Sequence, residues 1–314
     1  MGLDFEAPLE ALELKIRDLK LEAGDPAVSK DREIMALEVE LRHLRETIYA
    51  GLTPWQQVQL ARHPDRPLIT DYAREAFDEF IELHGDRRFS DDRALIGGFA
   101  SIDKHRVMLL GFSKGRSVEE KVRDNFGMAH PEGYRKALRL MELAEKYSLP
   151  VVSLVDTPAA YPGAAAEERG QAEAIARNIT RMASLRVPTI AVIAGEGGSG
   201  GALGIAVADV VMMLSNAIYS VIPPEGCAAI LWKDSNKAPE AAEALKITAK
   251  SLLELKVIDE IIPEPLGGAH RDPAGTALAL RRALIRRLSA LKGVSAGKLT
   301  GRRLEKYAAM GRAR

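Results

Sequence analysis

The first fifty positions alternate between polar and apolar residues with the spacing of a helix. Apolar side chains recur every three or four residues, at Leu9, Leu12, Ile16 and Leu19 and then at Ile34, Leu37, Leu41, Leu44 and Ile48. Gly24-Asp25-Pro26 interrupts this pattern, as glycine and proline do. Each half spans about two heptads, fewer than the three or four that sustain a coiled coil. We therefore expect an antiparallel helical hairpin, which either packs on its own domain or docks another subunit.

Beyond the hairpin, helix and strand signals alternate. Pro54, Pro64 and Pro67 predict a linker. The elements expected after it are a helix at 71–83, strands at 94–103 and 106–112, a helix from 133, a strand at 151–155, a helix at 168–185, strands at 189–194, 210–214 and 218–222, and basic helices over 273–310. The run at 151–155 is uniformly apolar, which is typical of a strand buried on both faces. The alternation predicts an α/β domain at 71–314 behind a helical extension and linker at 1–70.

Charge and cysteine content narrow the function classes. Lys plus Arg equals Asp plus Glu, at 44 each in 314 residues, so no net charge attracts nucleic acid or an acidic membrane. The single cysteine, Cys227, excludes an internal disulfide and a cysteine-based zinc site, and indicates a reducing compartment. The N-terminus is acidic where a signal peptide is basic, and no apolar run approaches the roughly 20 residues that span a bilayer. These observations predict a cytoplasmic protein.

The segment Gly195–Gly201 is the richest in candidate chemistry. A strand enters a glycine-rich turn that opens a helix, an arrangement whose backbone N–H groups bind phosphate or a developing oxyanion. Gly195, Gly197 and Gly200 fit the dinucleotide fingerprint, but no acidic residue follows about 20 positions later. No Lys-Ser or Lys-Thr pair follows the glycines, which excludes a P-loop.

Three interpretations of the glycine turn stay open. Gly197, Ser199 and Gly201 fit the nucleophile elbow of serine hydrolases, a fold that also needs an acid and then a histidine downstream. Only His270 follows, in what looks like a surface loop, with Asp234 or Asp259 as acid. The turn can instead serve packing alone. The third interpretation is an oxyanion hole without a nucleophile, for which two backbone N–H groups suffice.

Two neighbouring segments carry further candidates. The loop Asp156–Gly163 follows the buried strand, and the carboxyl ends of strands in α/β folds gather around one cleft. Its Tyr161 offers a ring and a hydroxyl to a substrate, although two prolines also make it a rigid connector. Lys114 and Arg116 follow another strand, where they either bind a phosphorylated cofactor tail or form a solvated basic face.

Five blocks of sequence indicate a family. They are Gly127–Leu140, Ala166–Gln171, Gly195–Leu203, Pro224–Trp232 and Ile262–His270. In this order they closely resemble the alpha subunits of bacterial acetyl-CoA carboxylase carboxyltransferase, and the likeness covers nearly the whole chain.

The resemblance implies a fold, a reaction and partners. The fold is the crotonase type (ClpP/crotonase-like), an α/β superhelix of β-β-α units, here behind an N-terminal helical hairpin. The reaction transfers a carboxyl group from carboxybiotin, held on a separate biotin carboxyl carrier protein, to acetyl-CoA, and gives malonyl-CoA for fatty acid synthesis. A beta subunit with a zinc ribbon completes an α2β2 heterotetramer that works with biotin carboxylase, so no metal is expected in this chain.

The resemblance also assigns site residues. The backbone N–H groups of Gly200 and Gly201, with Ala202 next, are implied as oxyanion donors to the biotin ureido oxygen. The residues implied to bind the biotin or acyl-CoA around them are Tyr161, Pro162, Gly163, Gly197, Gly198, Glu225, Gly226, Lys114 and Arg116. Three departures from the family pattern are Ala159 in place of glycine, Phe112-Ser113 in place of His-Gln, and Pro223 in place of serine. None of them touches the glycine turn.

Overall fold

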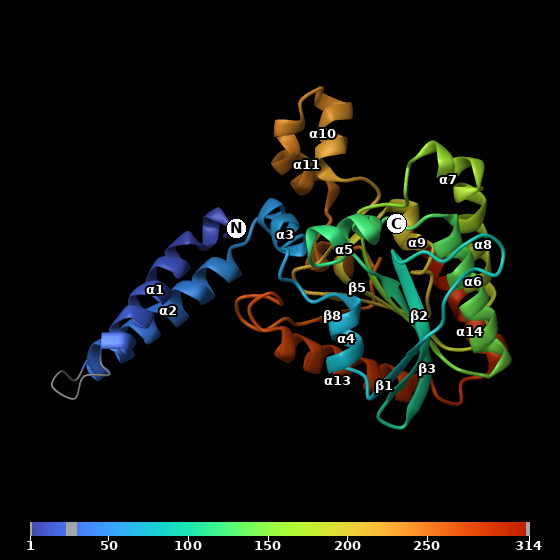
Figure 1. The fold of residues 1–314 in the computed structure, drawn as a ribbon, viewed down its shortest axis with the longest axis horizontal. Helices are drawn as coiled ribbons and strands as arrows, with labels where there is room; N and C mark the ends of the chain where they lie inside the picture. The colour runs from blue at the N-terminus through green and yellow to red at the C-terminus, as the bar shows by residue number, and fades with distance from the viewer. Residues whose placement is uncertain (1, 23–29, 312–314) are drawn as a thin grey trace.

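The computed structural model describes residues 2–22 and 30–311, and one mixed β-sheet organises them (Figure 1). The strands of this part of the chain are β1 (Glu79–Glu82), β2 (Leu95–Ile102), β3 (His105–Phe112), β4 (Val151–Thr157), β5 (Thr189–Gly198), β6 (Val210–Leu214), β7 (Ile218–Ser220) and β8 (Glu260–Ile262). Their order is β1-β2-β3-β4-β5-β6-β8, and β7 pairs with the end of β5. β1, β2 and β3 are antiparallel neighbours, whereas the sheet is parallel from β3 onward. The predicted α/β class is confirmed.

Helices cover this sheet and extend beyond it. They are α1 (Ala7–Glu22), α2 (Asp31–Ala50), α3 (Pro54–Ala61), α4 (Ile69–Glu75), α5 (Val118–Arg123), α6 (Pro131–Lys146), α7 (Ala164–Glu168), α8 (Gln171–Ser184), α9 (Ser199–Leu203), α10 (Pro224–Trp232), α11 (Ala238–Leu245), α12 (Ala249–Glu254), α13 (Pro273–Leu291) and α14 (Ala296–Ala309). α6, α8 and α14 pack together along one side of the molecule, and α4 packs with α13 on another (Figure 1). Within the described ranges, no helix combines the length and apolar character that crossing a membrane requires.

The centre of the sheet is the core of the molecule. Every residue of β5 is buried, and β4 is buried except at Asp156. Parallel strands covered by helices on both faces exclude water in this way, so the prediction from the apolar run at 151–155 is confirmed. The expected strand hairpin at 94–112 and the closing helices are confirmed as β2–β3 and as α13–α14.

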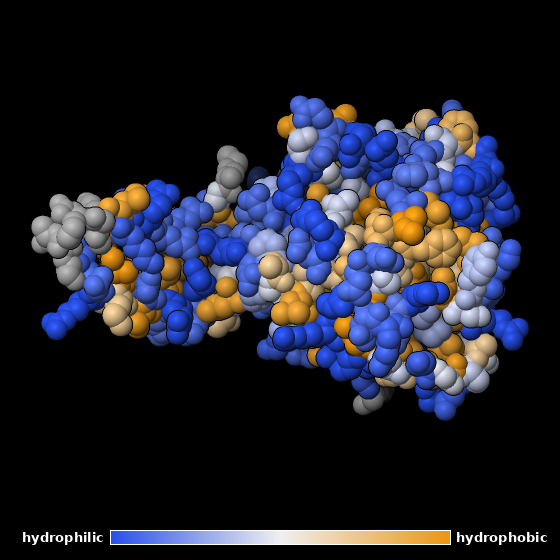
Figure 2. Space-filling view, turned by 60° about the horizontal axis from the view of Figure 1, so that its bottom comes forward, coloured by the Kyte–Doolittle hydropathy of each residue, from blue (hydrophilic) through white to orange (hydrophobic). Residues whose placement is uncertain are grey.

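The N-terminal helices form the predicted antiparallel hairpin, which projects from the body (Figure 1). Its interior is the apolar cluster of Ile16, Ile34 and Leu37, and two cross-helix ion pairs, Lys20–Glu38 at 2.6 Å and Glu13–Arg45 at 2.7 Å, fix the antiparallel register. The expected break at Gly24–Pro26 lies outside the described residues. Figure 2 shows apolar patches on the projecting hairpin, whose exposed large apolar residues are Leu14, Leu21, Met35 and Val39.

Two expected elements are wrong. The linker predicted from three prolines contains α3, because Pro54 occupies the first helical turn and Thr53 forms a capping box with Gln56. The helix expected over 71–83 ends at Glu75, and the rest of that segment contains β1. Pairing of β1 with the edge of β2 overrides the helical spacing there.

We predict that Arg303 of α14 is the most costly single cation to remove from the body. Its fully buried guanidinium bonds the Asp209 carboxylate at 2.8 Å and the backbone carbonyls of Met182 and Val187 at 2.5 and 3.2 Å. R303M leaves the carboxylate buried and unpaired, so it should lower the free energy of unfolding by about 3–5 kcal/mol. R302M, at the exposed neighbouring position, should change it by less than about 0.5 kcal/mol in the same urea titration. Equal effects of the two substitutions would contradict the assignment.

We also predict an acid-sensitive attachment of the hairpin. Glu6 is buried and bonds Tyr49 and Arg271 and lies 3.4 Å from His270. Burial alone raises the pKa of Glu6, but these three partners offset it and lower the pKa from 4.5 to about 2. The stabilisation is therefore complete above pH about 4.5 and is lost as the pH falls toward 2, by about 3 kcal/mol in total. Urea unfolding at stepped pH should show E6Q lacking this loss, whereas the exposed control E10Q keeps it.

Candidate active site

The glycine segment is the end of a buried strand followed by a sharp turn. β5 does not stop at Ala194 as expected but continues to Gly198, and α9 begins at Ser199. Gly197 lies opposite Thr157 of β4 on one side and Tyr219 of β7 on the other. Ser199 then adopts a left-handed conformation with φ of 50°. The first glycines of the motif are therefore strand residues, and only its second half is a turn.

Close backbone approach explains two of the glycines. A Cβ atom on Gly198 would overlap the Pro158 carbonyl oxygen, and one on Gly201 would lie 2.5 Å from the carbonyl carbon of Ala159. Gly200 differs, because the atom nearest to its Cβ position is 3.9 Å away. The structure thus brings the Asp156–Gly163 loop directly against the glycine turn, as the strand-end argument predicted. It leaves Gly200 with an open side.

A cavity of about 320 Å³ is lined by the first two residues of α9. Ser199, Gly200, Tyr219 and Ser220 give it polar lining, and the aliphatic lining residues are Leu203, Val221, Leu245, Leu252 and Val257. The first N–H groups of a helix have no intrahelical acceptor, so the start of α9 presents donors at the cavity wall. The site can therefore hold an anionic group against backbone N–H groups and an apolar group against the aliphatic wall.

The loop expected to form a substrate wall is held rigidly. The Tyr161 ring packs on His130 with centroids 4.4 Å apart, and the Gln171 amide donates to the Tyr161 carbonyl at 3.1 Å. His130 is itself positioned by Asp92, whose buried carboxylate accepts the His130 backbone N–H at 2.7 Å. Burial raises the pKa of Asp92. Pro162 and Gly163 follow on the partly exposed end of this loop. The sequence pattern singles out neither His130 nor Asp92, because their contact joins residues 38 positions apart in the chain.

Lys114 and Arg116 do not converge on the cavity. Lys114 lies 2.6 Å from Asp156, whose carboxylate also accepts the Glu196 backbone N–H at 2.8 Å. Arg116 pairs with Asp71 at 2.5 Å and lines a different cavity of about 440 Å³. Both cations thus form ion pairs with carboxylates of this chain. Neither residue lines the cavity beside the glycine turn, and their predicted role in cofactor binding stays a prediction.

The structure adds an arginine that the sequence did not single out. Arg62, the C-cap residue of α3, bonds Glu196 of β5 through three contacts of 2.6 to 3.1 Å and bonds Glu225, at the start of α10, at 2.5 Å. Partial burial lowers the pKa of Arg62, but the two carboxylates outweigh it and raise the pKa above its usual range. Glu225 and Gly226 are therefore fixed relative to the glycine strand. No motif marks Arg62, which falls in the segment read as a linker.

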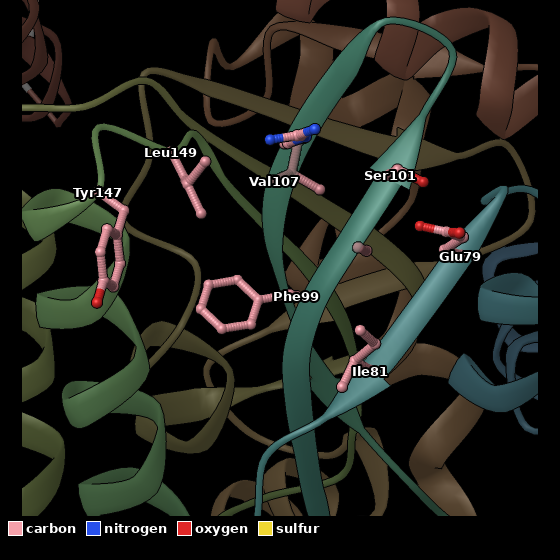
Figure 3. Close-up of a pocket in the computed structure, with 9 residues that line it drawn as sticks. Glu79, Ile81, Phe99, Ser101, Val107, Tyr147 and Leu149 are labelled. Carbon is pink, nitrogen blue, oxygen red and sulfur yellow. The ribbon is translucent and has the colours of Figure 1, made fainter.

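A second concavity lacks comparable chemistry. It measures about 450 Å³ and lies over the face of β1–β3 beside the end of α6 (Figure 3). Phe99 and Tyr147 meet there edge to face with centroids 6.4 Å apart, near Ile81. None of the residues predicted for a site lines it. In the described ranges, no group of three or more His, Cys, Asp or Glu side chains is placed to hold a metal ion.

Comparison with known proteins identifies the family. A family model described as acetyl co-enzyme A carboxylase carboxyltransferase-like matches residues 2–311. The alpha subunit of the acetyl-coenzyme A carboxylase carboxyl transferase of Geobacter metallireducens is 57% identical over 310 residues, which are 99% of this chain and 97% of that protein. The Burkholderia multivorans alpha subunit is 56% identical, over 99% of this chain and 96% of that protein. This chain belongs to the carboxyltransferase alpha-subunit family of acetyl-CoA carboxylase.

Solved structures agree on the fold of this alpha-subunit family member. A transcarboxylase 12S chain matches with a TM-score of 0.57 at 20% identity, over 71% of this chain and 42% of that one. A chain of a Pseudomonas malonate decarboxylase hetero-tetramer in complex with coenzyme A matches with the same TM-score at 18% identity, over 71% and 89%. The predicted crotonase-type fold is confirmed. The chain is a carboxyltransferase component of acetyl-CoA carboxylase.

The surroundings of His270 argue against the serine hydrolase alternative. Its ring packs on His63 with centroids 4.1 Å apart and lies near Glu6, and it does not line the cavity that Ser199 lines. Its side chain is only 6% exposed, so the expected surface loop at this position is also wrong. Ser199 has the left-handed backbone of an elbow but lacks its histidine.

We predict that Arg62 stabilises this member of the alpha-subunit family through its ion pair with buried Glu196. R62M leaves the Glu196 carboxylate, 6% exposed, without its cation, and should lower the free energy of unfolding by about 2–3 kcal/mol. The double variant R62M/E196Q removes both charges and should recover at least half of that loss. Urea unfolding of the single and double variants measures the coupling. If the loss in the free energy of unfolding of R62M/E196Q equals the sum of the losses of R62M and E196Q, the ion pair does not contribute to stability.

Proposed function

We propose that this chain supplies the backbone donors for carboxyl transfer from carboxybiotin, carried on a separate protein, to acetyl-CoA, which gives malonyl-CoA. The observation that carries the proposal is the start of α9, where Ser199 and Gly200 line a cavity that also has aliphatic lining residues. The N–H groups of Gly200 and Gly201, with Ala202 next to them, stabilise the negative charge that develops as the carboxyl group leaves. Donors placed in advance at such a position cost no reorganisation during the reaction.

The surrounding residues act by shaping this position. Gly198 allows close contact with the Pro158 carbonyl, and Gly197 allows close contact with the Tyr219 ring. In this proposal Tyr161–Gly163 and Pro224–Gly226 flank the transfer site. His130 packs on Tyr161, and Arg62 pairs with Glu225. The proposal places no substrate contact on Lys114 or Arg116, since both are paired with carboxylates.

The proposal includes the partners that the family implies. A beta subunit with a zinc ribbon completes the acyl-CoA pocket in an α2β2 heterotetramer, and the biotin carboxyl carrier protein and biotin carboxylase supply the carboxyl group in the cytoplasm. Exposed apolar side chains on α10, before it and at the end of α12 support a subunit interface: Val221, Ile230, Leu231, Trp232 and Leu255. In this arrangement 71–314 is the carboxyltransferase domain, and the extension at 1–70 serves docking.

The test is the reverse reaction, malonyl-CoA decarboxylation in the presence of biocytin, with this chain alone and with its cognate beta subunit. Activity is expected only in the mixture. Absence of activity in a mixture that assembles would contradict the proposal.

Gly200 allows the donor itself to be tested. G200P removes its N–H at a first-turn position that tolerates proline, and should lower kcat about 100-fold or more. G200A keeps the N–H and has room for its methyl group, so it should retain most activity. S199A should also remain active, because no nucleophile is required. Thermal unfolding and subunit assembly of each variant serve as controls, and full activity of assembled G200P would contradict the donor role.

A further inference from the structure

Another pocket, lined mainly by charged side chains, lies between the loop after β1 and helices α6 and α8. It measures about 180 Å³ and shares no lining residue with the cavity beside the glycine turn. Five arginines line it, namely Arg87, Arg88, Arg135, Arg139 and Arg177. So many cations in one small pocket repel one another unless carboxylates or a bound anion compensate them.

Carboxylates compensate only two of the five. Arg135 pairs with Asp86 at 3.0 Å, and Arg177 pairs with Glu173 one helical turn away. Arg87, Arg88 and Arg139 form no ion pair with any acidic residue in the described part of the chain.

Two of these unpaired guanidinium groups converge on one acceptor. Arg87 donates to the His84 carbonyl at 2.7 Å, and Arg139 donates to the same carbonyl at 3.2 Å and to the Gly85 carbonyl at 3.1 Å. Partial burial and the charge of Arg87 both lower the pKa of Arg139. Both cations are therefore held close together although solvent is within reach of each.

The loop that carries Arg87 and Arg88 is fixed before any ligand arrives. The carboxylate of Asp86, 5% exposed, accepts the backbone N–H groups of Arg88, Phe89 and Ser90 at 2.9, 2.8 and 3.1 Å. Arg87 itself has a left-handed φ of 63°. A site organised in this way loses little conformational freedom when it binds.

We propose that this pocket binds the phosphate group of a small phosphorylated molecule through Arg87, Arg88 and Arg139. The planar guanidinium fork matches the oxygens of a phosphate group, and its charge persists at any physiological pH. Glu142 also lines the pocket, without an ion pair in the described ranges, and opposes the anion. The proposal does not depend on the role proposed for the glycine turn, because the two pockets share no lining residue.

Calorimetric titration of the full-length chain with inorganic phosphate, and then with pyrophosphate, tests the proposal. The Arg88 side chain forms no hydrogen bond within the described structure, so R88Q removes a charge without disturbing the fold; R87Q/R88Q removes two. We expect the double variant to bind phosphate at least about tenfold more weakly. E142Q should bind phosphate more tightly than the unaltered chain, and R282Q, which removes an exposed arginine of α13, should bind it equally well.

The source of the phosphate is distinguished by titrating coenzyme A and 3′-dephospho-coenzyme A. Binding of coenzyme A that weakens in R87Q/R88Q, with no such effect on the dephospho form, identifies the 3′-phosphate as the ligand. If R87Q/R88Q weakens the binding of phosphate and pyrophosphate but not of coenzyme A, the ligand is a separate phosphorylated molecule. Equal binding of phosphate by R87Q/R88Q and the unaltered chain, or no saturable binding at millimolar phosphate, would overturn the proposal. Urea unfolding of each variant confirms that the loop remains folded.

Discussion

The backbone contact between the glycine turn and the loop after β4 is the constraint on which the site depends. Gly198 and Gly201 leave no room for a side chain against Pro158 and Ala159. This contact lets β5 continue past its hydrophobic stretch, so that α9 starts at the wall of the cavity rather than inside the core. The same contact is the place where the family departure at Ala159 matters, because its backbone faces Gly201.

Charge pairs around this contact hold the remaining walls. Glu196 sits within β5, where its backbone N–H bonds Asp156 and its side chain bonds Arg62. Asp156 in turn engages Lys114. A buried carboxylate at a strand end would be costly without these cations, so the pairs that satisfy it also join the residues just after β3 and α3 to β4 and β5. Through Glu225 the network extends to α10.

The sequence was sufficient for features that arise from local pattern. Uniform apolar runs marked β4, β5 and β6, and helical spacing marked the N-terminal hairpin and α6. The rule that strand ends share a cleft correctly placed the Asp156–Gly163 loop against the glycine turn. The predictions from sequence fail at positions where contacts with residues distant in the chain determine the structure. Glycines usually interrupt strands when only local sequence is considered, yet β5 extends through three of them because β4 and β7 pair with it.

Ion pairs were the least predictable part of the site. Lys114 and Arg116 look alike in sequence, but the first pairs with Asp156 of β4 and the second with Asp71 of α4, according to which carboxylate the fold places nearby. Arg62 was invisible for the same reason, since Glu196 and Glu225 are 134 and 163 positions away in the chain.

The surroundings of the turn also resolve the ambiguity of its motif. The segment satisfies both a dinucleotide and a nucleophile pattern, because each pattern asks only for small residues where a strand becomes a helix. The residues that line the cavity beside the turn distinguish a serine hydrolase from an oxyanion site without a nucleophile. A hydrolase needs a histidine within hydrogen-bond reach of the serine, and no histidine lines this cavity in the part of the chain that the structure describes. Backbone donors facing an aliphatic wall are instead suited to a reaction in which charge develops on the substrate and needs only to be held.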